Sequence, residues 1–191
     1  MHVLDKFLKQ VRARSAENLK SFNLLYDAYC YGVCIGIIRQ ELDSLLRVSY
    51  LVDHNSGFQL RSNALDLVKN SVEFGEWRFL NANQKMQKVN DKEMIKQGGW
   101  EQIVYKFGCG LIHLSNKHLY QDLDPVIMIE NEQKEEIIHY LKTYHRFEKN
   151  EVTMNDIIQY LPVIFQKIYE NIDAHIEQII LINNETKVFE D

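Results

Sequence analysis

Two predicted helices each place a cation and a histidine seven positions apart. The pairs are Arg47 with His54, and Lys106 with His113. A separation of seven is two helical turns, so the side chains of each pair share one stripe, about 10.5 Å apart along the axis. Two such stripes on neighbouring helices could hold a phosphodiester and move its protons. They could equally be polar seams in a bundle of helices.

The first of these stripes extends beyond the Arg47–His54 pair. Gln40, Asp43, Arg47, Tyr50 and His54 follow one another at alternating spacings of three and four. Asp43 stands four residues before Arg47, which is the favoured orientation for an ion pair within a helix. Such a pair would preorganise the guanidinium fork for a phosphate, with Asp43, Tyr50 and His54 as substrate-binding residues. The alternative is a structural seam, in which Arg47 simply pairs with Asp43 and His54 faces solvent.

The second helix carries a polar flank beside its apolar face. The flank consists of Lys106, Gly110, His113 and Lys117, with Asn116 beyond them. Glycine costs about 1 kcal/mol against alanine inside a helix, so Gly108 and Gly110 need a reason to be there. Close packing of another helix is one reason, and room for a ligand between the ammonium and the imidazole is another. We expect Asn116 and Lys117 to contact the substrate.

His113, Lys106 and Arg47 are the residues that could cleave RNA. Cleavage without a metal needs a base for the 2′-hydroxyl, an acid for the 5′-leaving oxygen and a cation for the phosphorane. His113 suits the acid–base role because imidazole ordinarily titrates near neutrality. Lys106 or Arg47 would hold the phosphate, and two symmetry-related copies would supply two histidines. This predicted catalytic site uses no metal and no cofactor.

The stretch YKFGCGLIH, from Tyr105 to His113, resembles the HEPN superfamily (higher eukaryotes and prokaryotes nucleotide-binding). Ribonucleases of that all-α superfamily carry an Arg-x(4–6)-His signature near a dimer cleft. Lys106 stands where the signature has arginine, and Phe107 where a polar residue usually follows. Lysine supplies charge without the bidentate fork, so the resemblance implies a weakened or lost activity.

The same resemblance implies a function and a set of partners. It implies a HEPN-like domain that forms a homodimer and binds RNA or a nucleotide. It further implies a toxin–antitoxin or phage-defence setting, with a protein partner such as an antitoxin. The alternative is a metal-independent endoribonuclease that uses His113 with Lys106 and Arg47.

The sequence supports a metal site or a nucleotide-binding loop less well than it supports the phosphate site described above. Glu136-x-x-His139 matches the helical carboxylate–imidazole pair of di-iron bundles, but that fold needs a second pair. We therefore expect Glu136 and His139 to be surface residues. His113, His118 and Asp122 are poorly spaced for a metal on a straight helix. Phosphate-binding loops, dinucleotide-binding turns and nucleophile elbows do not occur in the sequence.

The charge of the chain limits how it could meet nucleic acid. The formal net charge is −5, so no global cationic field attracts RNA. Any RNA contact must then come from a local patch or from a cleft between two chains. Tyr26, Tyr29 and Tyr31 cluster between the first two predicted helices, where we expect them to pack rather than to stack on bases.

The cysteines and the apolar segments indicate a cytoplasmic protein without membrane contact. Cys30, Cys34 and Cys109 form an odd set, and Cys30 and Cys34 lie one helical turn apart, as buried small hydrophobes do. The first fifteen residues contain no uninterrupted apolar stretch of the kind found in secretory signals. No window approaches about 18 uncharged apolar residues.

Helices must position all these candidate residues. With two prolines and eight glycines in 191 residues, the chain has few turn-builders for a large sheet. Apolar periodicity predicts helices over 3–26, 27–54, 58–73, 100–118, 131–149 and 153–183, with a loop and a short helix over 81–97. Asn131 and either Thr153 or Asn155 are the expected N-caps, and Pro162 should kink or split the last helix. We expect a single domain over 1–191, an antiparallel all-α bundle of five to six helices.

Overall fold

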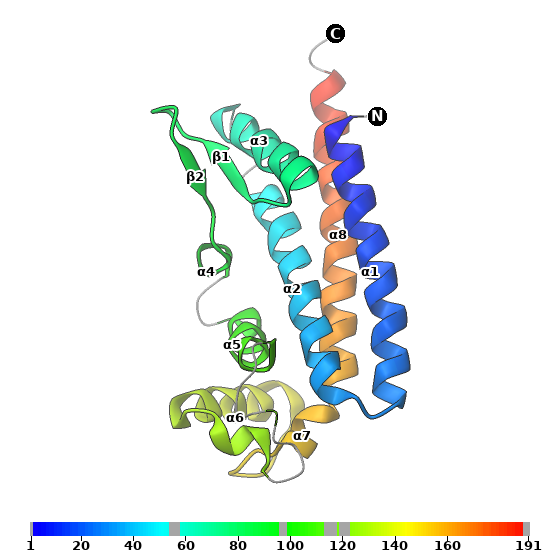
Figure 1. Ribbon diagram of the computed structural model, residues 1–191, viewed down its shortest axis with the longest axis vertical. Coiled ribbons are helices and arrows are strands. Elements are labelled where there is room, and N and C mark those ends of the chain that lie inside the picture. Colours follow the sequence, from blue (N-terminus) through cyan, green and yellow to red (C-terminus); the bar gives the residue numbers. More distant parts are fainter. Residues whose placement is uncertain (1, 54–57, 96–98, 113–117, 119–122, 189–191) are drawn as a thin grey trace. The chain divides into compact units, whose positions relative to one another are not determined.

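Helices dominate the computed structural model, which describes residues 2–53, 58–95, 99–112, 118 and 123–188 (Figure 1). The long helices are α1 (Val3–Asp27), α2 (Tyr31–Asp53), α3 (Phe58–Phe74), α5 (Trp100–Ile112), α6 (Asn131–His145) and α8 (Leu161–Val188). Shorter helical segments are α4 (Asp91–Met94), α7 (Met154–Ile158) and a 3-10 helix over Pro125–Met128. The expected all-α class is confirmed. None of the described helices is long and apolar enough to cross a membrane.

The described part of the chain divides into two compact units. The first unit lies within 1–19, 43–95 and 167–191, and the second within 20–42 and 96–166. Helices α1, α2 and α8 therefore contribute residues to both units. The single domain expected from the sequence stays a prediction.

The first unit has an apolar core to which α1 and α8 contribute residues three or four positions apart. The buried residues are Leu4, Phe7, Leu8 and Val11 on α1 and Ile168, Ile172, Ile176 and Ile179 on α8. This is the spacing that places side chains on one face of a helix. Trp77 joins this core, with its ring stacked 5.9 Å from that of Phe7. At the surface, Arg12 of α1 forms ion pairs with Asp173 and Glu177 of α8.

The second unit is built around Phe22 and Cys34. The ring of Phe22 stacks 4.7 Å from that of Phe165, and the Cys34 thiol donates to the Phe22 carbonyl at 3.8 Å. Cys34 is fully buried, and burial raises the pKa of its thiol to about 11. The expectation of burial was right for Cys34 and wrong for Cys30, which is exposed because it precedes the first residue of α2.

The turn between α1 and α2 ends the first helix sharply. Tyr29 adopts a left-handed backbone conformation with φ of 60°. The N–H of Cys30 bonds to the Leu25 carbonyl at 2.8 Å, and that of Tyr29 bonds to the Tyr26 carbonyl at 3.0 Å. This pair of bonds is a Schellman motif, which satisfies carbonyls at the end of a helix. The second helix consequently begins at Tyr31 and not at the predicted residue 27.

A short β-hairpin lies between α3 and α4 and was not predicted. Strands β1 (Arg78–Leu80) and β2 (Met86–Lys88) pair antiparallel, and β1 contacts α3 (Figure 1). Phe79 and Val89 are buried, and the Asn70 amide of α3 donates to the Arg78 carbonyl at 2.8 Å. Three-residue strands are too short to produce a recognisable alternation of polar and apolar residues. The expected short helix of this region is present as α4.

Caps and a proline set the ends of the later helices. Helix α6 begins after Glu130, so Asn131 is not its cap, and it ends at His145 because Arg146 is left-handed. Thr153 caps α7 as one of the two predicted candidates, in a capping box with Asp156. Pro162 is the second residue of α8, where the missing N–H costs no helical bond, and it marks the predicted split.

The capping box predicts an acid-sensitive contribution of Asp156 to stability. The buried Asp156 carboxylate accepts hydrogen bonds from Lys149 at 2.6 Å and from the Thr153 hydroxyl at 2.8 Å. These bonds hold its pKa below the ordinary value of 3.8. Because the folded pKa is lowered, the stabilisation is present above pH 3.8 and is lost as the pH falls through the folded value.

We expect Asp156→Asn to lower the free energy of unfolding by about 1 kcal/mol near neutral pH. Urea unfolding at neutral pH and below the ordinary carboxyl pKa measures this, and the difference from wild type should shrink in acid. The exposed Asp5→Asn variant is the control and should change stability by a few tenths of a kcal/mol at either pH. A difference between Asp156→Asn and wild type that does not depend on pH would contradict the assignment.

Candidate functional site

The predicted site residues fall into three groups. Asp43, Arg47 and Tyr50 lie on α2 in the first unit, and Lys106 lies on α5 in the second unit. His54, His113, Asn116 and Lys117 lie outside the described residues. The predicted roles of these four residues therefore stay predictions.

Asp43 and Arg47 form the ion pair expected from their spacing. Two guanidinium nitrogens of Arg47 donate to the two carboxylate oxygens of Asp43, at 3.1 and 3.0 Å. Arg14 of α1 approaches the same carboxylate at 3.5 Å. The fork of Arg47 is thus already matched to a carboxylate, which a phosphate would have to displace.

The Arg47 guanidinium also lies near the ring of Trp77. Its central carbon lies 5.3 Å from the Trp77 ring centre, and Tyr50 meets Trp77 edge to face at 6.4 Å. Burial, with the negative charge of Glu93 as a smaller cause, raises the pKa of Tyr50. This arrangement has the features of a structural polar seam, the alternative that the sequence left open.

Lys106 also has a carboxylate partner. Its ammonium lies 2.9 Å from each carboxylate oxygen of Glu136 on α6. Both side chains are about one-third exposed, so a phosphate could reach Lys106 but would compete with Glu136. Glu136 therefore forms an ion pair, and the described residues contain no group of three His, Cys, Asp or Glu side chains that could hold a metal.

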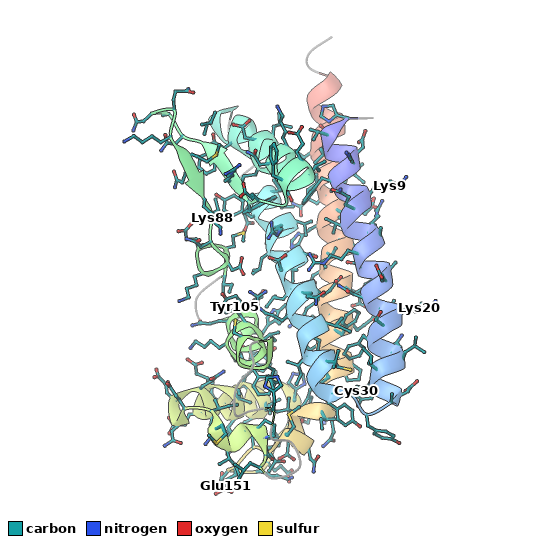
Figure 2. The ribbon with its side chains drawn as sticks, viewed as in Figure 1. Lys9, Lys20, Cys30, Lys88, Tyr105 and Glu151 are labelled. Atoms are coloured by element: carbon teal, nitrogen blue, oxygen red, sulfur yellow. The ribbon has the colours of Figure 1, made fainter. Side chains whose placement is uncertain are left out.

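Gly108 on α5 is explained by close packing. A Cβ atom built at Gly108 would lie 3.1 Å from the Cβ of Arg39 on α2, closer than most side-chain contacts allow. Arg39 is buried, and its guanidinium lies 4.1 Å from the Tyr105 ring centre, a cation–π contact (Tyr105 is labelled in Figure 2). Arg39 was not among the predicted site residues, although a cation directly after the apolar run Ile35–Ile38 was a signal for it.

A cavity of about 680 Å³ opens beside the first turn of α2, within the second unit. We call it the tyrosine pocket, and it is lined by Tyr29, Cys30, Tyr31, Gly32, Val33, Leu123, Asp124, Pro125, Met154, Asn155 and Ile158. Figure 2 labels Cys30 at the turn that leads into α2. Three segments far apart in the sequence build this pocket, so no local pattern could have predicted it.

The three tyrosines at the pocket behave differently from one another. The Tyr26 hydroxyl donates to the Ile158 carbonyl at 3.3 Å, and Tyr31 packs edge to face against Tyr26. Tyr29 meets Tyr31 at 88° with ring centres 6.1 Å apart, yet Tyr29 is 78% exposed. The expected packing is confirmed for Tyr26 and Tyr31, whereas the Tyr29 ring presents most of its surface to solvent.

Asp124 joins two of the segments that form the pocket. One of its carboxylate oxygens accepts from the Val126 N–H at 2.8 Å, and the other accepts from the Met154 N–H at 3.0 Å. The carboxylate therefore caps the 3-10 helix and satisfies an N–H at the start of α7. Among the described residues that line the pocket, Asp124 alone carries a charge. The two backbone N–H groups that donate to its carboxylate stabilise this negative charge.

A second surface that the sequence analysis missed lies on the β-hairpin of the first unit. We call it the hairpin surface, and it consists of the exposed polar residues Asn83, Gln84, Lys85, Gln87 and Lys88. No carboxylate of the described residues pairs with the ammonium of Lys85 or Lys88. Figure 2 labels Lys88 at the end of β2.

The seam around Arg47 predicts a strong dependence of stability on Asp43. We expect Asp43→Ala to lower the free energy of unfolding by about 2 kcal/mol, because it leaves a half-buried guanidinium without its carboxylate. The double variant Asp43→Ala/Arg47→Ala should lose less than the sum of the two single variants in urea unfolding. Strict additivity would show that the pair contributes nothing. Arg12→Ala, which breaks an exposed pair, is the control and should cost under about 1 kcal/mol.

The resemblance to HEPN proteins rests on the stretch from Tyr105 to His113. Of the predicted catalytic residues in that stretch, the structure describes Lys106 and its pairing with Glu136. No protein-family model matches this chain, and neither a curated protein nor a solved structure matches it.

Proposed function

We propose that this protein binds RNA or a nucleotide without cleaving it, and that a nucleobase enters the tyrosine pocket. The exposed ring of Tyr29 beside a cavity of about 680 Å³ is the observation that carries this proposal. Aromatic side chains stack on bases of any sequence because every base has a π-face. A large, mostly apolar cavity with a few polar groups is the usual form of a small-molecule site.

The order of the tyrosine cluster supports stacking. Tyr31 is held between Tyr26 and Tyr29, and the Tyr26 hydroxyl is anchored on Ile158. Burial and the neighbouring tyrosines raise the pKa of Tyr31, so its hydroxyl remains neutral at physiological pH. A platform held in this way loses little conformational freedom when a ring stacks on it.

The polarity of the pocket favours a base over a phosphate. No cation is among the described residues that line it, and the Asp124 carboxylate already accepts two backbone N–H bonds. A phosphate would gain no charged partner there, whereas an uncharged base would gain stacking and hydrogen bonds. The exposed Asn155 amide can donate to and accept from the edge of a base. The sugar and the phosphate would remain outside, in solvent.

The pairing of the candidate cations favours binding over cleavage. Lys106 is matched to Glu136 and Arg47 is matched to Asp43, so neither cation is free to stabilise a phosphorane. Cleavage with His113 would require a substrate that displaces these carboxylates. The resemblance to HEPN proteins adds the expected homodimer and an antitoxin-like partner in toxin–antitoxin or phage defence, and the cysteines and apolar segments add the expected cytoplasmic setting.

We expect Tyr29→Ala to weaken the binding of a dye-labelled oligoadenylate. The loss of one stacked base corresponds to about 1–3 kcal/mol, or about five- to 150-fold in dissociation constant. Fluorescence anisotropy measures this, and calorimetry with adenosine tests the pocket without any phosphate. Alanine keeps the Cβ at the left-handed position 29, so backbone strain is unchanged.

Two further variants serve as controls for the stacking test. Tyr29→Phe keeps the ring and should bind as wild type does. Tyr144→Ala removes another tyrosine of the second unit that is 68% exposed and does not line the pocket. Absence of binding by the wild-type protein to oligoadenylate and to adenosine would overturn the proposed function.

The ribonuclease alternative is tested with His113→Ala. We expect wild-type protein to leave a labelled single-stranded RNA intact in the presence of a chelator, because Lys106 and Arg47 are neutralised by carboxylates. Gel electrophoresis of the RNA after incubation is the measurement. Cleavage by the wild type that disappears in His113→Ala would favour the endoribonuclease, whereas equal cleavage by both would indicate a contaminating nuclease.

A further inference from the structure

We propose that the hairpin surface docks the phosphate backbone of single-stranded RNA, an inference that rests on the proposed RNA binding. Lys85 and Lys88 would contact phosphates, and the neighbouring amides would contact base edges. The surface thus supplies positive charge, which the described residues that line the tyrosine pocket lack.

The charge of the hairpin differs from that of the chain. No acidic residue occurs from Arg78 to Asn90, whereas the whole chain carries a net charge of −5. Lys85 and Lys88 are exposed and have no carboxylate partner among the described residues, in contrast to Lys106 with its partner Glu136. Unpaired exposed cations on an acid-free segment are complementary to a polyanion.

The strand register places two cations directly opposite each other. Arg78 of β1 faces Lys88 of β2. Like charges at such cross-strand positions are destabilising unless a third group neutralises one of them. Arg78 forms an ion pair with Glu76 at 2.5 Å, which leaves the Lys88 charge available to a partner.

The tip of the hairpin is internally ordered. The Asn81 side-chain oxygen accepts the N–H groups of Asn83 and Lys85, each at 3.0 Å. Gln84 is left-handed with φ of 57°, and its N–H bonds to the Asn81 carbonyl at 2.9 Å. A preordered tip binds at a smaller entropic cost than a flexible loop would.

The base of the hairpin is fixed to the core of the first unit. Phe79 and Val89 are buried, and the Val89 N–H bonds to the Trp77 carbonyl at 3.0 Å. The three residues of β2 that follow the tip are all exposed. The hairpin therefore presents its polar residues from a rigid support, as two-stranded ribbons that bind nucleic acid do.

The side chains favour RNA over an anionic membrane. Asn83, Gln84 and Gln87 carry amides, which form paired donor and acceptor contacts with base edges. The large exposed apolar side chains beside the hairpin surface are the cross-strand pair Leu80 and Met86, each a little under half exposed. One such pair is a small area for insertion into lipid, so the membrane becomes an outcome of the test.

The test compares Lys85→Gln/Lys88→Gln with the matched control Lys9→Gln/Lys20→Gln in the full chain. Lys9 and Lys20 are exposed on α1 and labelled in Figure 2, and both double variants remove two positive charges. Anisotropy of a dye-labelled oligoadenylate is measured across a salt series. The plot of log affinity against log salt has a negative slope, and we expect its magnitude to decrease by about 1.4 in the hairpin variant. This corresponds to about 0.7 for each phosphate contact that is lost.

The outcomes separate this inference from the proposed function. An unchanged slope in the hairpin variant, or an equal fall in the control, would overturn the hairpin assignment. If Tyr29→Ala still weakened oligoadenylate binding, the proposed function would stand without it. Binding to phosphatidylserine vesicles that is lost in the hairpin variant, with an unchanged RNA slope, would replace RNA by a membrane as the partner.

Discussion

Burial of one apolar stripe on α8 is the constraint on which both units depend. Leu161 and Phe165 belong to the core of the second unit, and Ile168, Ile172, Ile176 and Ile179 to the core of the first. Each is at most 2% exposed, and each such burial is worth about 1.5–3 kcal/mol. Pro162 lies in the first turn of this helix, where its missing N–H costs no helical bond.

Whether a cation on the surface of these units can bind an anionic ligand depends on whether a carboxylate already pairs with it. Arg47 and Lys106 were the most attractive phosphate ligands in the sequence, yet each is matched to a carboxylate. Lys85 and Lys88 were not among the predicted phosphate ligands, yet no carboxylate of the described residues pairs with them. Charge that is already paired contributes to structure, whereas unpaired exposed charge remains available for a ligand.

In the proposed function, the tyrosine pocket and the hairpin surface would meet two different requirements of RNA binding. The pocket supplies an exposed aromatic ring and little charge, and the hairpin surface supplies cations and amides on a rigid support. Stacking and phosphate contacts are independent contributions to the affinity of a protein for single strands. The proposed function therefore does not require any residue of the predicted catalytic site.

The sequence by itself determined what depends on neighbours within one helix. The helical periods, a cap at Thr153 or Asn155, a kink or split at Pro162 and the Asp43–Arg47 pair could all be predicted from it, because helix geometry relates residues a few positions apart. Tertiary packing decided the rest. The Lys106–Glu136 pair spans 30 positions, the hairpin strands have three residues each, and the pocket joins three separate segments. Such contacts depend on how the helices pack, and local periodicity carries no information about that packing.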